Sequence, residues 1–204
     1  MGFYDDRILP RVINLTCGAK ALFPIRQWAC EGLHGEVVEL GFGSGLNVGA
    51  YPDTVTRVSA IEPSDGGWHL AEDRIKESTI PITRAGLDGQ RLPFDDNTFD
   101  SALSTFTLCT IPDLQAALHE VRRVVKDDGT LHFLEHGLAP DEKVRRWQHR
   151  LDPLEQRIAG GCRLTRDIPR ELTDAGLSIT ANKRFYGAWP KSFGALNVGV
   201  AQIQ

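Results

Sequence analysis

The chain has few cysteines, no long hydrophobic run and no excess of basic residues. Its four cysteines, at positions 17, 30, 109 and 162, are irregularly spaced and form no CxxC pair, unlike the cysteines of zinc-binding motifs. We therefore expect free thiols in a reducing compartment and no metal site. No segment approaches the roughly 18 apolar residues of a membrane span, and the N-terminus lacks the pattern of a signal peptide. These absences favour a cytoplasmic protein.

The charge balance argues against a nucleic-acid partner. The 204 residues include 23 basic and 27 acidic side chains, and the formal net charge is −4. The sequence has no cluster of basic residues that would provide the positive surface needed to bind a phosphate backbone. The length is that of one domain spanning residues 1–204. We expect a small-molecule substrate and a monomer or a homodimer.

Short apolar runs alternate with helix-like segments along most of the chain. The runs predicted to be strands cover residues 36–40, 56–62, 80–85, 99–104 and 129–135. The helix-like segments between and after them cover residues 65–78, 112–126 and 140–158. This alternation is typical of an α/β fold with a parallel sheet and helices on both faces.

The two ends of the chain depart from this alternation. Residues 5–33 are predicted to be helical before the first strand. A short helix over residues 166–175, capped by Thr165, precedes two strands at residues 177–187 and 192–202. The link between these strands is too short for a crossover helix, so they must be antiparallel. The prediction is a doubly wound, mostly parallel seven-stranded sheet that closes with an antiparallel hairpin.

A glycine-rich loop follows the first predicted strand. Its glycines, Gly41, Gly43 and Gly45, let a ligand approach the backbone closely. A dinucleotide fingerprint needs glycine at the first, third and sixth places, whereas Leu46 stands at the sixth place here. The spacing therefore disfavours NAD, and no Lys-Ser or Lys-Thr follows that would make a phosphate-binding Walker loop.

Glu62 ends the second predicted strand. An acid at this place faces the ligand crevice at the carboxyl edge of a parallel sheet. Its carboxylate can accept hydrogen bonds from both hydroxyls of a ribose, and the preceding glycine loop favours that function over a solvated strand-end charge.

The order of these motifs resembles that of class I S-adenosylmethionine-dependent methyltransferases, more narrowly the type 11 methyltransferase domain. The residues that carry the resemblance are VVELGFGSG, AIEPS, LDGQRLPFDDNTFD and EVRRVVKDDGTLHFLEH, within residues 35–136. It implies a Rossmann-like fold, with residues 1–33 as a helical lid and residues 137–204 on the substrate side. Glu135-His136 and Gly161-Cys162 also resemble the alkyl-thiol methyltransferase group, whose membrane anchor this sequence lacks.

The resemblance implies S-adenosylmethionine as cofactor and S-adenosylhomocysteine as product. The Gly41 carbonyl would accept from the ammonium of the cofactor, and Glu39 would support the loop. Asp88 and Gly89 match the pair that contacts the adenine edge. The full set of residues implied to bind the cofactor is Glu39, Gly41, Gly43, Gly45, Glu62, Pro63, Asp88, Gly89 and Thr105.

His136, directly after the fifth strand, is the candidate catalytic residue, because imidazole takes a proton near neutral pH. Residues suggested to line the substrate site are Tyr4, Cys109, Arg150 and Tyr186. For Cys109 and Cys162 we favour a buried, inert thiol, because nothing nearby in the sequence predicts a depressed thiol pKa. The segment at 140–158 carries an apolar stripe that includes Trp147, which we expect to face the core.

The sequence favours a methyltransferase whose acceptor is a thiol or another soft nucleophile. An oxygen or nitrogen acceptor on a hydrophobic metabolite or lipid amine is the first alternative. An NAD-linked oxidoreductase on the same architecture and an inactive cofactor-binding module are the others.

Overall fold

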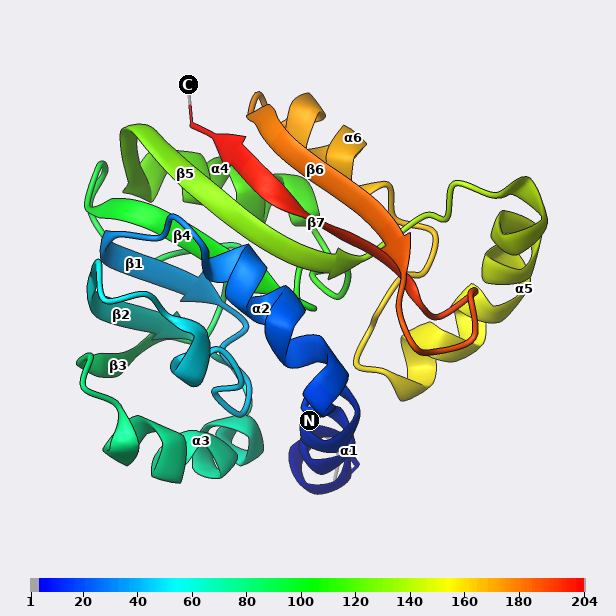
Figure 1. The fold of residues 1–204 in the computed structure, drawn as a ribbon, viewed down its shortest axis with the longest axis horizontal. Coiled ribbons are helices and arrows are strands. Elements are labelled where there is room, and N and C mark those ends of the chain that lie inside the picture. Colours follow the sequence, from blue (N-terminus) through cyan, green and yellow to red (C-terminus); the bar gives the residue numbers. More distant parts are fainter. Residues whose placement is uncertain (1–3, 204) are drawn as a thin grey trace.

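A seven-stranded sheet forms the centre of the computed structural model, which describes residues 4–203. The strands lie in the order β3-β2-β1-β4-β5-β7-β6 (Figure 1). Their bounds are β1 Gly35–Leu40, β2 Val55–Ile61, β3 Ile82–Gly86, β4 Phe99–Thr105, β5 Val125–His136, β6 Ser178–Tyr186 and β7 Ala195–Gln202. β1 to β5 pair in parallel, and β7 is antiparallel to both β5 and β6. The predicted mostly parallel sheet with its closing hairpin is confirmed.

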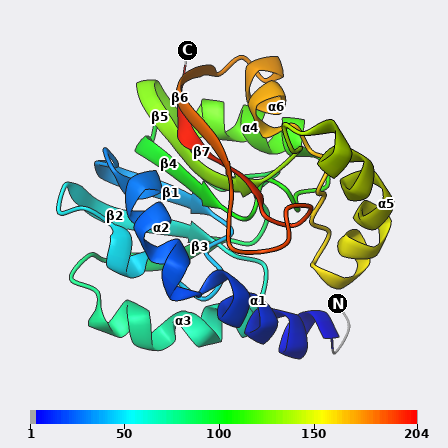
Figure 2. The same cartoon turned by 45° about the vertical axis from the view of Figure 1, so that its right-hand side comes forward.

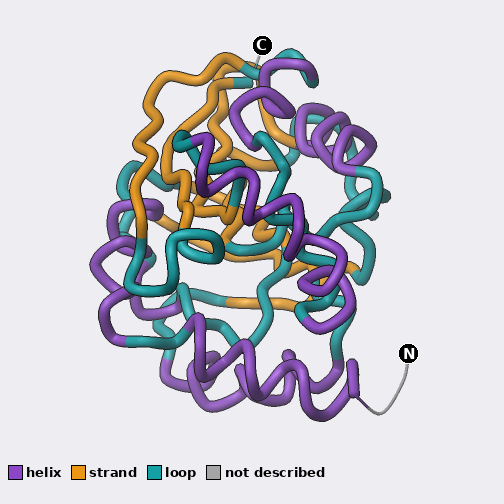
Figure 3. Tube along the Cα trace, turned by 90° about the vertical axis from the view of Figure 1, so that its right-hand side faces the viewer, coloured by secondary structure: helices purple, strands orange, loops and turns teal. Residues whose placement is uncertain are grey.

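Helices cover both faces of this sheet. The α-helices are α1 Leu9–Cys17, α2 Phe23–Cys30, α3 Asp65–Glu77, α4 Leu114–Val124, α5 Glu142–Ile158 and α6 Ile168–Asp174. A π-helical turn over Tyr4–Ile8 precedes α1, and short 3-10 turns occupy Lys20–Leu22 and Val48–Ala50. α2 and α3 lie on one face and α4 and α6 on the other, with the strands between them (Figures 2 and 3).

The alternation of side chains along the strands explains the three layers. In β1, Val37 packs with Cys30 and Leu33 beside α2, whereas Val38 and Leu40 point to the opposite side and pack in the cluster that contains α4. Successive residues of a strand face opposite sides of the sheet. Since both faces carry helices, apolar residues of β1 are buried on both sides of the sheet, together with the buried polar residue Glu39.

α4 shows the helical period that its sequence predicts. Its buried apolar residues recur every three or four positions, so they form one stripe against the sheet. They are Leu114, Ala117, Leu118, Val121 and Val124. The Asp113 carboxylate caps the helix by accepting a hydrogen bond from the amide of Ala116 at 3.0 Å.

Two local predictions were wrong. Trp147 of α5 is 57% exposed, and Leu154 and Ile158 are also exposed, because α5 projects beyond the edge of the sheet (Figure 1). The buried residue of α5 is instead Gln148, whose side-chain amide bonds to the backbone of Gly137 and Ala139. Thr165 does not cap α6, which begins three residues later with Asp167 at the N-cap position and no side-chain capping bond.

Register brings the ends of three strands together. Leu40, the last residue of β1, pairs with Ile61 of β2 and with Ser104 of β4. Strand order reverses at β1, since β2 follows on one side and β4 on the other. Such a switch point leaves a crevice beyond the carboxyl ends of the strands, where open α/β sheets bind their ligands.

Candidate active site

A cavity of about 730 Å³ opens at this switch point. Its floor contains the ends of β1, β2 and β4, including Leu40, Ile61 and Thr105. Its walls come from the glycine loop, from the segments after β2, β3 and β4, from α1, and from the end of α5 and the turn after it. Residues from the N-terminal helices, the ends of three strands and the end of α5 therefore meet around one space.

The glycine loop turns beneath the cavity with left-handed backbone. Gly41, Gly43 and Gly45 have φ angles of +67°, +57° and +73°, a region that favours glycine. A Cβ on Gly41 would collide with Thr107, whereas a Cβ on Gly43 would meet no protein atom closer than 3.9 Å. Gly43 thus presents open space to the cavity. Gly45 does not line it, because its Cα packs toward Ala71 and Phe42.

Glu62 connects the glycine loop to the start of α3. Its carboxylate lines the cavity and accepts hydrogen bonds from the amides of Gly43 at 2.5 Å and Ser64 at 2.7 Å. Burial raises the pKa of this carboxyl, while the two amides act in the opposite direction. A carboxylate has about four acceptor sites, so it retains capacity for further donors beyond these two amides.

The segment after β3 forms the far end of the cavity. Pro63, Asp88 and Gly89 all line it. The Asp88 carboxylate accepts from the backbone amide of Gln90 at 2.9 Å, which fixes the turn on which Gly89 lies.

A buried polar network lies under the cavity, and sequence reasoning missed most of it. Arg26 of α2 donates to Asn47 Oδ1 at 2.7 Å and to Thr105 Oγ1 at 3.0 Å. Asn47 donates in turn to Glu39 at 2.8 Å, and the Tyr51 hydroxyl donates to the same carboxylate. Thr105 and Arg26 line the cavity, whereas Glu39 lies below it. Burial lowers the pKa of the Arg26 guanidinium.

Glu39 should make the folded state less stable as the pH rises. Burial raises the pKa of its carboxyl from 4.5 to about 7, so the folded protein retains a proton that the unfolded chain releases. The favourable contribution is complete below about pH 4.5 and is lost as the pH rises through 7. The difference between the two pKa values corresponds to about 3 kcal/mol.

Urea denaturation at about pH 5 and about pH 8 measures this effect in the wild type and in Glu39→Gln. The free energy of unfolding of the wild type should fall by about 3 kcal/mol more than that of the variant. Burial also raises the pKa values of Glu62 and Glu135, but both carboxyls are common to the two proteins. Equal pH dependence in both proteins would contradict the prediction.

α1 covers part of the cavity. Four of its residues line one side of the cavity: Leu9, Pro10, Ile13 and Cys17. The other side is lined by residues at the end of α5 and in the turn after it, which are Gln156, Arg157, Ala159, Gly160 and Gly161. The Tyr4 hydroxyl donates to the Ile158 carbonyl at 2.6 Å, which ties the N-terminal segment to the end of α5. Tyr4 itself does not line the cavity.

The other candidate substrate residues also lie outside the cavity lining. Arg150 stacks its guanidinium over the Trp147 ring at 5.4 Å, on the exposed side of α5. The Tyr186 hydroxyl donates to the Asp141 carboxylate at 2.5 Å. Cys109 is buried behind the wall, with 1% of its surface exposed.

His136 packs between two aromatic rings. Its ring centroid lies 5.0 Å from that of Phe106 and 5.5 Å from that of Trp189. Phe106 lines the cavity and His136 does not. The imidazole Nδ1 lies 3.6 Å from the sulfur of Cys162.

Cys162 is buried, as its sequence context suggested, but two groups that the sequence did not reveal lie beside its thiol. The neighbouring thiol of Cys109, 3.5 Å away, and the imidazole of His136 hold the pKa of Cys162 below its usual range, at about 5. The pKa of Cys109 is raised, by its hydrogen bond with Cys162 and by burial. No sequence spacing signals this group, since its members lie 26 to 53 residues apart.

The comparisons with known proteins agree with this architecture. Residues 38–133 match the family described as a methyltransferase domain. The chain therefore carries a methyltransferase domain, and the cofactor of that domain is S-adenosylmethionine. This match favours a methyltransferase over the NAD-linked oxidoreductase that the sequence left open.

Individual relatives extend the likeness. The thiol S-methyltransferase TMT1B of Rattus norvegicus is 31% identical over 148 residues, covering 70% of this chain and 59% of that protein. The demethylmenaquinone methyltransferase of Thermobifida fusca is 28% identical over 169 residues, covering 81% of this chain and 67% of that protein. The chain spans about three fifths of the length of the curated thiol S-methyltransferases that it matches.

Solved structures share the fold. An S-adenosylmethionine-dependent methyltransferase of Thermotoga maritima, described as a possible histamine N-methyltransferase, has a TM-score of 0.70 at 19% identity. The comparison covers 97% of this chain and 99% of that one. Within residues 4–203, no helix has the length and apolar character needed to cross a bilayer.

Proposed function

We propose that this chain transfers the methyl group of S-adenosylmethionine to a small-molecule thiol. The observation that carries the proposal is the likeness to thiol S-methyltransferases, at 30–32% identity over 148 residues. The alignment with TMT1B covers 70% of this chain, which is more than the segment of residues 38–133 that matches the methyltransferase domain. The likeness therefore extends beyond the segment that matches the methyltransferase domain.

The charges around the cavity support the same acceptor. Among the described residues, Glu62 and Asp88 are the only carboxylates that line it, and no histidine does. Arg26 and Arg157 add positive charge to the walls. A thiol with a pKa of about 8.5 is already a few per cent thiolate at pH 7, and nearby cations favour the anion. An alcohol would instead need a strong base.

The proposed cofactor contacts follow the strand order. Glu62 would accept from the two ribose hydroxyls, and Asp88 with the amide of Gly89 would contact the adenine edge, beside Pro63. The Gly41 carbonyl would accept from the ammonium of the methionine part. The positively charged Arg26, whose Nε is buried with no partner among residues 4–203, is the counter-ion proposed for the cofactor carboxylate.

Methyl transfer from a sulfonium is an in-line displacement. A lone pair of the acceptor sulfur forms the new S–C bond, and the pair of the breaking C–S bond stays on the sulfur of S-adenosylhomocysteine. The thiol proton leaves before attack. Holding the two sulfurs in line and excluding water supply most of the rate enhancement. The general-base role predicted for His136 stays a prediction, since Phe106 separates its ring from the cavity.

Calorimetry and a panel of acceptors test the proposal. We expect S-adenosylhomocysteine to bind and NAD not to bind. With S-adenosylmethionine present, an alkyl thiol should release S-adenosylhomocysteine faster than a phenol or an amine of similar size and hydrophobicity. Turnover with the phenol or the amine alone would support an oxygen or nitrogen acceptor instead. Cofactor binding without turnover on any acceptor would support an inactive binding module.

A further inference from the structure

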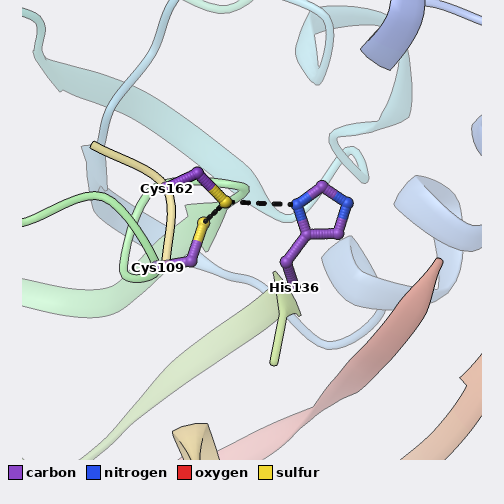
Figure 4. Close-up of side chains that lie close together, drawn as sticks. All are labelled: Cys109, His136 and Cys162. Atoms are coloured by element: carbon purple, nitrogen blue, oxygen red, sulfur yellow. Dashed lines mark hydrogen bonds between the residues drawn. The ribbon is translucent and has the colours of Figure 1, made fainter. Parts of the chain in front are cut away.

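Two cysteines and a histidine meet behind the wall of the cavity. Cys109 lies in the loop after β4, His136 ends β5, and Cys162 lies in the turn after α5 (Figure 4). The two sulfurs are 3.5 Å apart, and the sulfur of Cys162 is 3.6 Å from Nδ1 of His136. All three atoms lie within 4.8 Å of one another.

The two separations from the sulfur of Cys162 fit the first coordination sphere of zinc. Tetrahedral Zn²⁺ with bonds of about 2.3 Å to sulfur and about 2.0–2.1 Å to nitrogen puts two sulfurs about 3.8 Å apart and a sulfur and a nitrogen about 3.6 Å apart. The sulfurs are also well beyond the length of a disulfide bond, which is about 2.05 Å. Two thiolates and one imidazole are a donor set that suits zinc.

The loops that carry the ligands are held in place independently of any metal. The amide of Arg163 donates to the Cys109 carbonyl at 3.0 Å, which joins the two cysteine loops. The Glu135 carboxylate accepts from the amides of Thr107 and Cys109 at 3.1 and 3.3 Å. Both cysteines are at most 4% exposed. The donor atoms are therefore preorganised.

The group offers three ligands and not four. Among the side chains that the structure describes, no further His, Cys, Asp or Glu joins it. Structural zinc sites are usually closed by four protein ligands, whereas catalytic sites keep one position for water or substrate. The composition of this group is that of the open kind.

Residues beside each ligand belong to the cavity wall. Gly161 precedes Cys162, Thr110 follows Cys109, and the Phe106 ring packs on His136; all three of these neighbours line the cavity. By strand order the group lies on the β4–β5 side, whereas Asp88 and Gly89 follow β3 at the opposite end of the parallel strands. A metal here is thus close to the acceptor end rather than to the adenine end.

We propose that Cys109, His136 and Cys162 form a zinc site whose fourth position binds the acceptor thiol; this rests on the proposed thiol methylation. On binding, the thiol loses its proton to solvent and becomes a zinc-bound thiolate. Its lone pair attacks the methyl carbon, and the pair of the breaking bond remains on S-adenosylhomocysteine. The resulting thioether is neutral and a weaker ligand than the thiolate, so it leaves. The three ligands do not themselves line the cavity, so the thiol would reach the zinc through the wall formed by Phe106, Thr110 and Gly161.

Cobalt binding tests the site without relying on turnover. The full chain, stripped of metal and kept reduced, should bind about one Zn²⁺ or Co²⁺ per chain and show the absorption of cobalt–thiolate bonds. Cys109→Ser and Cys162→Ser should each lose that absorption and most of the bound metal. Cys30→Ser is the matched control, because Cys30 is also buried and free but packs with Leu33 and Val37. Affinity for S-adenosylhomocysteine shows whether each variant is folded.

The same cobalt protein tests the fourth position. Adding an alkyl thiol should change the cobalt spectrum, and adding a phenol should not. A wild type that binds no metal with its thiols reduced, or that forms a Cys109–Cys162 disulfide instead, overturns the site. Metal binding without a response to thiol overturns the role of the fourth position. A spectral response to thiol with no methyl transfer supports the site and counts against the proposed function.

Discussion

Glu62→Ala should weaken binding of S-adenosylhomocysteine by tenfold or more. The structure places this carboxylate in the cavity with the amides of Gly43 and Ser64 as fixed partners. The variant loses the acceptor proposed for the ribose hydroxyls, at about 1.5–3 kcal/mol per charge-assisted hydrogen bond. It also releases the glycine loop from the start of α3. Glu62→Gln keeps one carbonyl acceptor, so its loss should be smaller.

Isothermal calorimetry of the three proteins measures the difference. Asp73→Ala is the control, because Asp73 is an almost fully exposed acid on α3 that does not line the cavity. The control should bind as the wild type does. If Glu62→Ala folds and keeps wild-type affinity, the ribose assignment is wrong.

Gly43→Val should reduce cofactor binding by about 10–100-fold while the protein still folds. Because a Cβ at this position meets no protein atom within 3.9 Å, the added side chain occupies space in the cavity rather than in the core. Overfilling a packed site costs about 1–3 kcal/mol, which gives the expected loss of affinity. The φ of +57° adds strain that lowers the melting temperature by a few degrees, at a cost of roughly 1–2 kcal/mol.

Gly49→Ala provides a nearby comparison. Gly49 lies in the 3-10 turn after the loop and does not line the cavity, and a Cβ there makes ordinary contact with the Phe23 ring at 3.7 Å. Its affinity for S-adenosylhomocysteine should match that of the wild type. Wild-type binding by Gly43→Val would mean that the loop is a tight turn and not a cofactor cradle.

The sequence was sufficient to predict the sheet, because strands buried on two faces leave a simple pattern in the sequence. Short segments rich in apolar residues, such as those of β1 and β4, stand out between helical segments, and the short link before β7 permits only an antiparallel pairing. α5 was interpreted wrongly because an apolar stripe does not reveal what lies opposite it. Its buried contact with the sheet end of the fold includes Gln148, a polar residue whose amide satisfies the backbone groups of Gly137 and Ala139.

The candidate site likewise has one part that the sequence predicted and one part that it did not. The glycine loop and Glu62 are local motifs at strand ends, so the chain order alone brings them to one edge. Arg26 carries no such signal, since a single arginine in a helix is usually solvated. It is buried here only because Asn47, Thr105 and the Cys17 carbonyl offer acceptors from three other segments. The Cys109, His136 and Cys162 group equally depends on loops that meet only in three dimensions.

The cover formed by α1 also bears on the speed of the cycle. α1 places Leu9 and Ile13 over the cavity but leaves Val12 46% and Leu15 78% exposed. We therefore predict that this helix opens at a smaller free-energy cost than the sheet. Spent cofactor would then be exchanged through a brief local opening. The residues that govern chemistry and those that govern the residence time of the product thus lie in different parts of the chain and can change independently.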